Sequence, residues 1–238
     1  MDEINDMEPG FIARDDLDPN IVSALTQKSR GVWFLGNKDL LKRDGISFCG
    51  SRKASNTGLE TARRCAVEAV KLGAGTVSGN ASGVDLHVHG ATLESGGWSI
   101  FVLAEGIANF RIKKAFADVW DWDRCLVISQ YEPGDRWQVW RAMERNNLII
   151  ALGIAMIVIE AGETGGTREA ARQTMKAGKP LFAVTYENSV PGNDAIISEG
   201  AKLLGRHKDT GKPNIAKVLN LADSHLQKDF PAQQSLPL

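Results

Sequence analysis

The stretch I-S-F-C-G-S-R-K-A-S-N, residues 46–56, predicts a short buried strand that ends in a tight polar turn. Residues 46–49 form an apolar run, Gly50 breaks it, and Ser51, Arg52 and Lys53 follow immediately. A strand that ends by exposing a hydroxyl and two cations is typical of a turn that binds phosphate.

The same rhythm of strand, turn and helix recurs along the chain after Gly45. Apolar runs occupy residues 46–49, 75–78, 99–103, 125–129, 154–159 and 180–184, and helical patterns occupy 57–72, 82–95, 136–152 and 167–177. Nearly continuous apolar runs are typical of parallel strands that are buried on both faces. We therefore predict an α/β fold, with an open, doubly wound, mostly parallel sheet flanked by helices.

Length, charge and cysteine content limit the possible functions. The chain has 238 residues and a formal net charge of −1, so binding to nucleic acid or phosphate requires a local basic patch. Its three cysteines are far apart, which predicts a reducing compartment without disulfides or a zinc site. The acidic start is no signal peptide, and no apolar run approaches the roughly 20 residues that span a bilayer. We expect a cytoplasmic protein that has no membrane partner.

Three segments are expected. Residues 1–43 read as a leader that packs on the core, with a short helix within 18–29 and a short strand at 31–36. Residues 44–206 form the sheet domain. Residues 207–238 predict a C-terminal helix followed by a flexible tail.

In an open parallel sheet, ligands bind beyond the carboxyl ends of the strands. Four turns rich in glycine or hydroxyl residues follow predicted strands and should converge at that edge, where hydroxyls, helix N-termini and Arg52 can bind an anion. The plainer alternative is that the glycines only make tight turns and that Arg52 pairs with a carboxylate. Neither G-x-x-x-x-G-K-[ST] nor G-x-G-x-x-G is present in these turns, which disfavours an NTPase and a nicotinamide cofactor. We expect no cofactor.

Six sequence motifs, taken together, resemble those of the DprA/Smf DNA-processing family. They are G-S-R at 50–52, S-G-N-A-S-G-V-D-L-H-V-H-G-A at 78–91, E-S-G-G-W-S-I-F-V-L at 94–103, R-N-N-L-I-I-A-L at 145–152, I-V-I-E-A at 157–161 and P-G-N-D-A-I-I-S-E-G-A at 191–201. The resemblance implies an extended Rossmann-like domain that binds single-stranded DNA without catalysis, forms a homodimer and helps to load a RecA-type recombinase in natural transformation and DNA recombination.

The turns and the resemblance together predict a DNA- and phosphate-binding site. Its expected residues are Gly50, Ser51, Arg52, Lys53, Ser78, Gly79, Ser82, Gly83, Arg145, Asn146, Gly165, Gly166, Thr167 and Lys179. Trp137 and Trp140, with Arg136 and Arg141 beside them, are candidates for contacting the bases and phosphates, although the i, i+3 spacing of the tryptophans on a helix also suits core residues. The chain departs from the family pattern at Asn147, where an arginine is usual, and its length after the sheet domain predicts no winged-helix module.

Two other functions remain open at this stage. The T-G-G-T-R-E-A turn at 164–170 resembles part of a motif in LOG-type nucleotide phosphoribohydrolases. In that interpretation Glu169 acts on the ribose of a nucleoside monophosphate, and Arg168 or Arg52 on its phosphate. The third possibility is a sensor that holds a small nucleotide in the same pocket. His87 and His89 lie at i and i+2 on a helix and are not expected to share a metal, and Asp85 is expected to cap that helix or tie down a turn.

Overall fold

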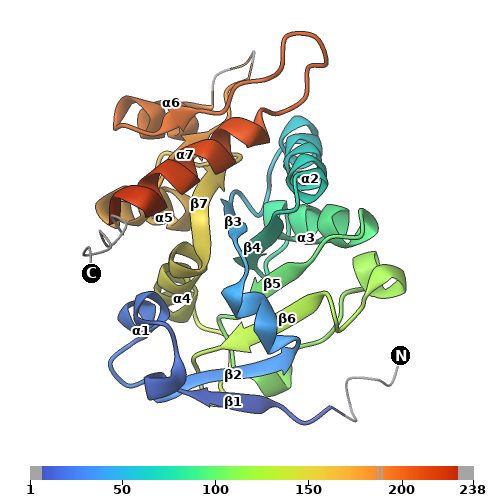
Figure 1. Ribbon diagram of the computed structural model, residues 1–238, viewed down its shortest axis with the longest axis vertical. Coiled ribbons are helices and arrows are strands. Elements are labelled where there is room, and N and C mark those ends of the chain that lie inside the picture. The colour runs from blue at the N-terminus through green and yellow to red at the C-terminus, as the bar shows by residue number, and fades with distance from the viewer. Residues whose placement is uncertain (1–6, 187, 189, 230–238) are drawn as a thin grey trace, which may run out of the picture.

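The computed structural model describes residues 7–186, 188 and 190–229 (Figure 1). The strands are β1 (Gly10–Ala13), β2 (Gly31–Gly36), β3 (Gly45–Cys49), β4 (Gly75–Gly79), β5 (Ser99–Val102), β6 (Cys125–Ser129), β7 (Gly153–Val158), β8 (Leu181–Ala183) and β9 (Lys202–Leu203). The α-helices are α1 (Pro19–Ala24), α2 (Asn56–Lys71), α3 (Val84–Glu94), α4 (Val139–Leu152), α5 (Gly166–Lys176), α6 (Pro191–Ser198) and α7 (Ile215–Asp229). Four short 3₁₀ helices lie at Arg14–Asp16, Lys38–Lys42, Ile107–Asn109 and Lys114–Val119.

Within the described residues, the nine strands belong to one sheet, in the order β1-β2-β6-β5-β4-β3-β7-β8-β9. The strands from β6 to β9 in that order are parallel, whereas β1 and β2 pair antiparallel at the β6 edge. The predicted α/β fold with a mostly parallel, doubly wound sheet is confirmed. The six strands predicted after Gly45 are β3 to β8, and the short strand predicted at 31–36 is β2.

The chain reverses its direction of travel across the sheet at the centre. From β3 it moves outward through β4 and β5 to β6, and α4 then carries it back to β7 on the other side of β3. β3 and β7 are therefore neighbours, with Ile46 opposite Ala155 and Cys49 opposite Val158. Such a reversal leaves a crevice beyond the carboxyl ends of the two strands, where ligands bind in folds of this class.

Helices cover both faces of the sheet, as Figure 1 shows. On one face, apolar residues of α1, α4, α5 and α6 pack against strand residues such as Val77, Val102 and Met156. On the other face, α2, α3 and α7 pack around Phe48 and Ile157. A third cluster joins the β2, β5 and β6 edge to the 3₁₀ segments, with Phe101 at its centre. The resulting layers hold the central strands rigidly below the crevice.

The first segment of the chain is more than a leader. Its described part supplies both antiparallel strands, since β2 pairs with β6 and β1 pairs with β2. At the other end, α7 contributes Ile215, Val218 and Ala222 to the same core as the central strands. The expected tail lies outside the described residues, apart from Asp229 at the end of α7. Among the helices that the structure describes, none is long and apolar enough to cross a bilayer.

Candidate nucleic-acid interface

A cavity of about 470 Å³ lies beyond the carboxyl ends of β3 and β7, and we call it the strand-end cavity. It is lined by the turn after β3, the first residues of α5 and one side of α4. Its lining residues are Phe48, Cys49, Gly50, Ser51, Arg52, Lys53, Ala81, Asp85, Trp137, Val139, Ala142, Met143, Arg145, Asn146, Ile149, Gly166 and Thr167. The structure thus brings together most of the residues that the sequence nominated.

Backbone hydrogen bonds fix the turn after β3. The N–H of Ser51 donates to the carbonyl of Glu160 (2.8 Å), and the N–H of Val84 donates to the carbonyl of Ser51 (3.3 Å). Gly83, which precedes α3, has a φ of +74°, and a Cβ there would lie 2.4 Å from the Ser51 carbonyl oxygen. Only glycine suits that position, because the left-handed backbone and the close contact both exclude a side chain. The turn therefore presents Arg52 and Lys53 from a fixed backbone.

Arg52 and Trp137 form a cation–π pair at the mouth of the cavity. The guanidinium carbon of Arg52 lies 5.3 Å from the centre of the Trp137 ring, and within the described part of the chain no carboxylate forms an ion pair with it. Trp137 is 44% exposed and Trp140 is 54% exposed, so the expectation that these tryptophans are core residues is wrong. The helix begins only at Val139, which leaves Trp137 on the preceding loop.

Arg145 is the buried cation of the site, with only 6% of its surface exposed. Its Nη1 donates to the carbonyl of Val102 (2.7 Å), while its buried Nε has no hydrogen-bond partner among the described residues. Burial lowers the pKa of Arg145, and the charge of Asp85 opposes that shift most strongly. Gly79 makes room for the guanidinium, since a Cβ there would lie 1.8 Å from Nη1. Arg145 therefore supplies positive charge at the floor of the cavity. Gly79 contributes only indirectly, because its lack of a side chain leaves room for the Arg145 guanidinium.

The N-terminus of α5 forms the opposite wall. Gly165 has a φ of +103° and starts the helix, and Gly166 and Thr167 line the cavity. Asn146 is buried, with Nδ2 3.5 Å from the Gly166 carbonyl, so α4 lies directly against this turn. Unpaired N–H groups in the first turn of a helix favour an anion. With Arg52 and Lys53 opposite, the arrangement suits a phosphate group.

A smaller hollow of about 130 Å³ adjoins the cavity beyond β5 and shares Arg52, Trp137 and Arg145 with it. Ser82 lines this hollow, as does Glu105, which the site prediction omitted. Burial raises the pKa of Glu105, although the charge of Arg145 opposes that shift. The position of Glu105 directly after an apolar run was the signal that could have nominated it.

Two predicted site residues lie elsewhere. Ser78 is fully buried, with Oγ 2.9 Å from both the Phe48 carbonyl and Asp85 Oδ1, so it fastens α3 to the sheet. Lys179 lies at the amino edge of the sheet, where its Nζ donates to the carbonyls of Ile150, Ala151 and Gly153. The structure therefore places neither side chain at the strand-end cavity, because one points into the core and the other occupies the opposite edge.

Of the residues named for the hydrolase alternative, Arg52 lines the cavity, whereas Arg168 and Glu169 do not. Arg168 forms an ion pair with Glu199, and Glu169 accepts a hydrogen bond from Gln173 (3.1 Å). Both side chains are engaged along α5 and toward α6, away from the turn after β3. This placement removes the proposed pair from the position where a nucleotide would bind.

The histidines of α3 have separate surroundings. His89 is buried, with Nδ1 2.6 Å from Ser99 Oγ and Nε2 2.7 Å from the Gly79 carbonyl. His87 instead lies 2.9 Å from the Gly83 carbonyl through Nδ1. Within the described chain, no group of three or more His, Cys, Asp or Glu side chains could hold a metal ion. Asp85 accepts a hydrogen bond from the N–H of Ala81 (3.2 Å), so it ties down the turn before α3.

The sheet order and the strand-end cavity define a Rossmann-type α/β protein with a crevice at its switch point. The family model for DNA recombination-mediator protein A matches residues 11–212, and the chain belongs to that family. The DNA processing protein DprA of Streptococcus pneumoniae is 30% identical over 206 residues, which cover 84% of this chain and 72% of that protein.

Two solved structures of DNA processing protein A agree with this assignment. The Streptococcus pneumoniae structure has a TM-score of 0.70 at 28% identity and covers 84% of this chain and 72% of its own. The Helicobacter pylori structure, which concerns the single-stranded DNA binding mode of that protein, has a TM-score of 0.73 at 21% identity. It covers 94% of this chain and 98% of its own. At that identity the second similarity concerns the fold.

Proposed function

We propose that this protein binds single-stranded DNA in the strand-end cavity without catalysis. The observation that carries the proposal is the convergence of Arg52, Lys53 and the α5 N-terminus on one cavity whose mouth holds an exposed tryptophan. Arg and Lys supply phosphate contacts that do not depend on base sequence, and an exposed aromatic ring stacks on any base. Membership of the DNA recombination-mediator family supports this interpretation.

The biological setting belongs to the same proposal. A protein of this family that binds single strands in the cytoplasm can hand them to a RecA-type recombinase during DNA uptake or recombination. A homodimer would place two strand-end cavities on one assembly and so increase the affinity for a long strand. Sedimentation of the purified protein tests the dimer, and a recombinase-loading assay tests the handover.

The direct test is fluorescence anisotropy with a labelled single-stranded oligonucleotide and with duplex DNA as competitor. We expect Arg52→Ala to lower the affinity by about 1–3 kcal/mol, the range for a lost charge-assisted contact. Lys176→Ala is the matched control, since Lys176 is an exposed cation in the last turn of α5, away from the cavity. Equal affinities of the two folded variants and the unmutated protein would contradict the proposal.

A nucleotide sensor is the second candidate, and the size of the cavity favours it. A volume of about 470 Å³ lies within the range for small-molecule sites and would enclose one nucleotide. Competition with a mononucleotide separates the two functions. If a mononucleotide binds tightly and oligonucleotides bind no better, the sensor is correct, whereas displacement only by oligonucleotides supports DNA binding.

A further inference from the structure

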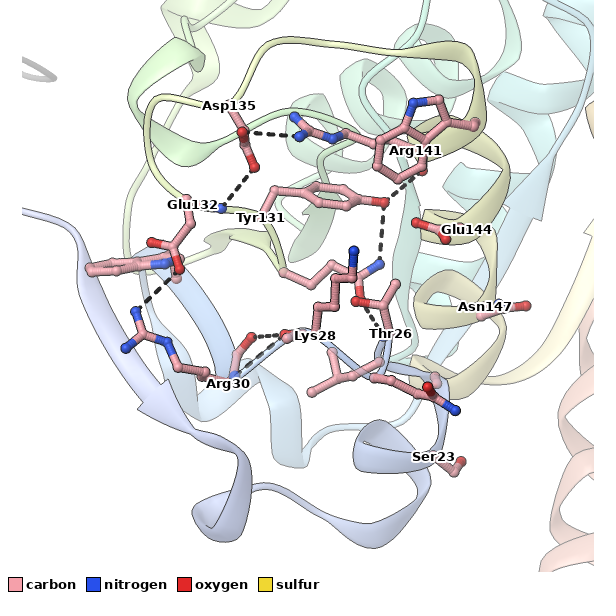
Figure 2. Close-up of a pocket in the computed structure, with 18 of the residues that line it drawn as sticks. Ser23, Thr26, Lys28, Arg30, Tyr131, Glu132, Asp135, Arg141, Glu144 and Asn147 are labelled. Atoms are coloured by element: carbon pink, nitrogen blue, oxygen red, sulfur yellow. Dashed lines mark hydrogen bonds and ion pairs between the residues drawn. The ribbon is translucent and has the colours of Figure 1, made fainter.

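A second cavity, of about 610 Å³, lies on the other side of α4 from the strand-end cavity, and we call it the edge cavity (Figure 2). Its walls are the loop between α1 and β2, the loop after β6 and the face of α4 that carries Trp140, Glu144 and Asn147. The antiparallel strands β1 and β2 close the cavity at its outer side through Phe11 and Trp33.

One helix separates the two cavities. Trp140, Glu144 and Asn147 follow an i, i+4, i+7 pattern toward the edge cavity, whereas Ala142 and Asn146 line the strand-end cavity. An α-helix with its side chains is about 10 Å wide, so the cavities are close neighbours at the same end of the sheet. Trp137 lines the strand-end cavity and Trp140 lines the edge cavity, and both side chains are exposed.

Most polar groups around the edge cavity are already engaged. Arg141 pairs with Asp135 (3.0 Å), and Arg30 pairs with Glu132 (3.2 Å). The Tyr131 hydroxyl donates to the Arg141 carbonyl (2.8 Å). These partners neutralise one another and leave few groups free to recognise a ligand.

Two charged side chains at the edge cavity, Glu144 and Lys28, can each accept or donate further polar contacts to a ligand. Oε2 of Glu144 is buried without a hydrogen-bond partner among the described residues, and the terminal torsion of a glutamate turns freely enough to present either oxygen. Its charge adds to the effect of burial, which raises the pKa of Tyr131 to about 12. Lys28 is exposed, and no ion pair within the described chain involves it. Figure 2 shows Lys28 and Glu144 reaching the cavity from the loop and from α4.

We propose that the edge cavity binds a second nucleotide of the strand held in the strand-end cavity. In this arrangement a base stacks on Trp140, its amino group donates to Glu144, and a phosphate contacts Lys28. This inference rests on the proposed function, because it requires a single strand at the first cavity. A nucleotide carries both the donor that Glu144 lacks and the anion that Lys28 lacks. A basic peptide side chain offers only the donor.

Glu144 gives the edge cavity a base preference. A carboxylate accepts a hydrogen bond from the amino group of cytosine, whereas thymine has a carbonyl oxygen at the same position. We therefore expect oligo(dC) to bind about tenfold more tightly than oligo(dT) when the strand is long enough to reach both cavities. A strand confined to the first cavity should show no such preference.

The test compares short and long oligonucleotides by fluorescence anisotropy. A dinucleotide is short enough to remain in one cavity, whereas roughly twelve nucleotides reach both, because four nucleotides at about 3.4 Å per step would already span the roughly 10 Å width of α4. Trp140→Ala should weaken the long oligo(dC) about tenfold and leave the short one unchanged. Glu144→Gln should reduce the preference for oligo(dC), and Lys28→Ala should weaken both long oligonucleotides, with Lys176→Ala as the control for charge.

The outcomes separate this inference from the proposed function. If Arg52→Ala weakens binding but Trp140→Ala, Lys28→Ala and Glu144→Gln change nothing for the long strand, the edge-cavity inference is wrong and the first site stands. If the unmutated protein binds no oligonucleotide, both fail. If a tetra-arginine peptide binds and Trp140→Ala and Glu144→Gln abolish that binding while DNA affinity is unchanged, the cavity instead serves a basic protein partner.

Discussion

At the scale of single residues, the pair formed by Arg52 and Trp137 determines what the strand-end cavity offers a ligand. The guanidinium of Arg52 lies over the ring of Trp137, so each side chain limits the motion of the other before any ligand arrives. Groups that are held in place before binding lose less entropy on binding. The pair therefore presents a cation and a flat aromatic surface at fixed positions.

Replacing Trp137 tests the stacking role. We expect Trp137→Ala to lower single-stranded DNA affinity by about 1–3 kcal/mol, the range for one base stacked on an aromatic side chain. Trp137→Phe should keep most of the affinity because it retains a ring. Leu203→Ala removes another exposed apolar side chain, on β9, and serves as the control in the same anisotropy assay. If the alanine and phenylalanine variants bind equally, stacking on this residue is excluded.

His89 makes folding stability depend on pH. Burial lowers the pKa of His89 from 6.5 to about 3, so at neutral pH the folded and unfolded states are both neutral at this residue. Below pH 6.5 only the unfolded chain takes up the proton, and the free energy of unfolding should fall by up to about 1.4 kcal/mol per pH unit. The contribution is complete above pH 6.5 and is lost as the pH approaches 3.

Urea denaturation at pH 7 and pH 5 measures this effect. Replacement by His89→Gln removes the titrating group, so the variant should lose about 2 kcal/mol less than the unmutated protein over that interval. The two proteins are compared by their changes with pH, which separates titration from the packing lost beside Phe101. Parallel pH profiles would rule out His89 as the source.

At the scale of elements, α4 lines both cavities, and Lys179 donates hydrogen bonds to the C-terminal end of this helix. The helix runs from the carboxyl edge of the sheet, where it lies between the cavities, to the amino edge, where its final carbonyls meet Lys179. The last four carbonyls of a helix have no partners within it. The lysine ammonium supplies donors to two of them and to the start of β7.

Removing that ammonium should destabilise the protein without affecting the binding site. We expect Lys179→Met to lower the free energy of unfolding by about 2–3 kcal/mol, because carbonyl groups that receive a charged donor lose it. Lys176→Met, at the exposed end of α5, should change little. Urea denaturation gives the stability and anisotropy gives the DNA affinity. A loss of DNA affinity at unchanged stability would contradict the role assigned here.

The sequence predicted those helices and strands whose own residues carry a clear hydrophobic pattern. The apolar runs at 46–49 and 125–129 lie within β3 and β6, since such residues are buried on both faces of the sheet. By contrast, β1 and β9 were missed, because four- and two-residue strands carry little pattern and depend on distant partners. The adjacency of β3 and β7 depends on strand order, which local patterns do not specify.

The predicted site residues likewise fall into two groups, those whose position a local pattern predicted and those for which the local pattern misled. Arg52 and Thr167 follow glycine turns at carboxyl ends of strands, and both line the cavity. Lys179 has the same local chemistry, with a glycine before it, but precedes its strand and so occupies the other edge. The i, i+3 spacing of Trp137 and Trp140 suggested a shared helix face, which failed because the helix starts between them.

At the scale of the whole molecule, the net charge of −1 gives no overall attraction for DNA, so DNA binding must depend on local charged groups. Within the described part of the chain, the exposed cations at the two cavities that have no carboxylate partner are Arg52, Lys53 and Lys28, all at one end of the sheet. Because no general positive field attracts DNA, affinity should depend on the few phosphates that these side chains neutralise.

The salt dependence of binding counts those phosphates. For single strands, log K falls by about 0.7 per phosphate for each tenfold rise in salt, so three contacts predict a slope near −2.1 for the long oligonucleotide. Lys28→Ala should reduce the magnitude to about 1.4 for the long strand. Titrations at four salt concentrations give the slope. A magnitude well above 3 would indicate further contacts outside the two cavities.

The adjacency of β3 and β7 also has a consequence for how the protein acquires its site. More than a hundred residues separate Ile46 from Ala155, and their pairing must wait until the chain between them has been synthesised. A nascent chain that ends after α3 already holds the Gly50–Lys53 turn but has no opposite wall. The cavity therefore needs residues from both ends of the sheet domain, and a chain that stops before α5 lacks the wall that Gly166 and Thr167 supply.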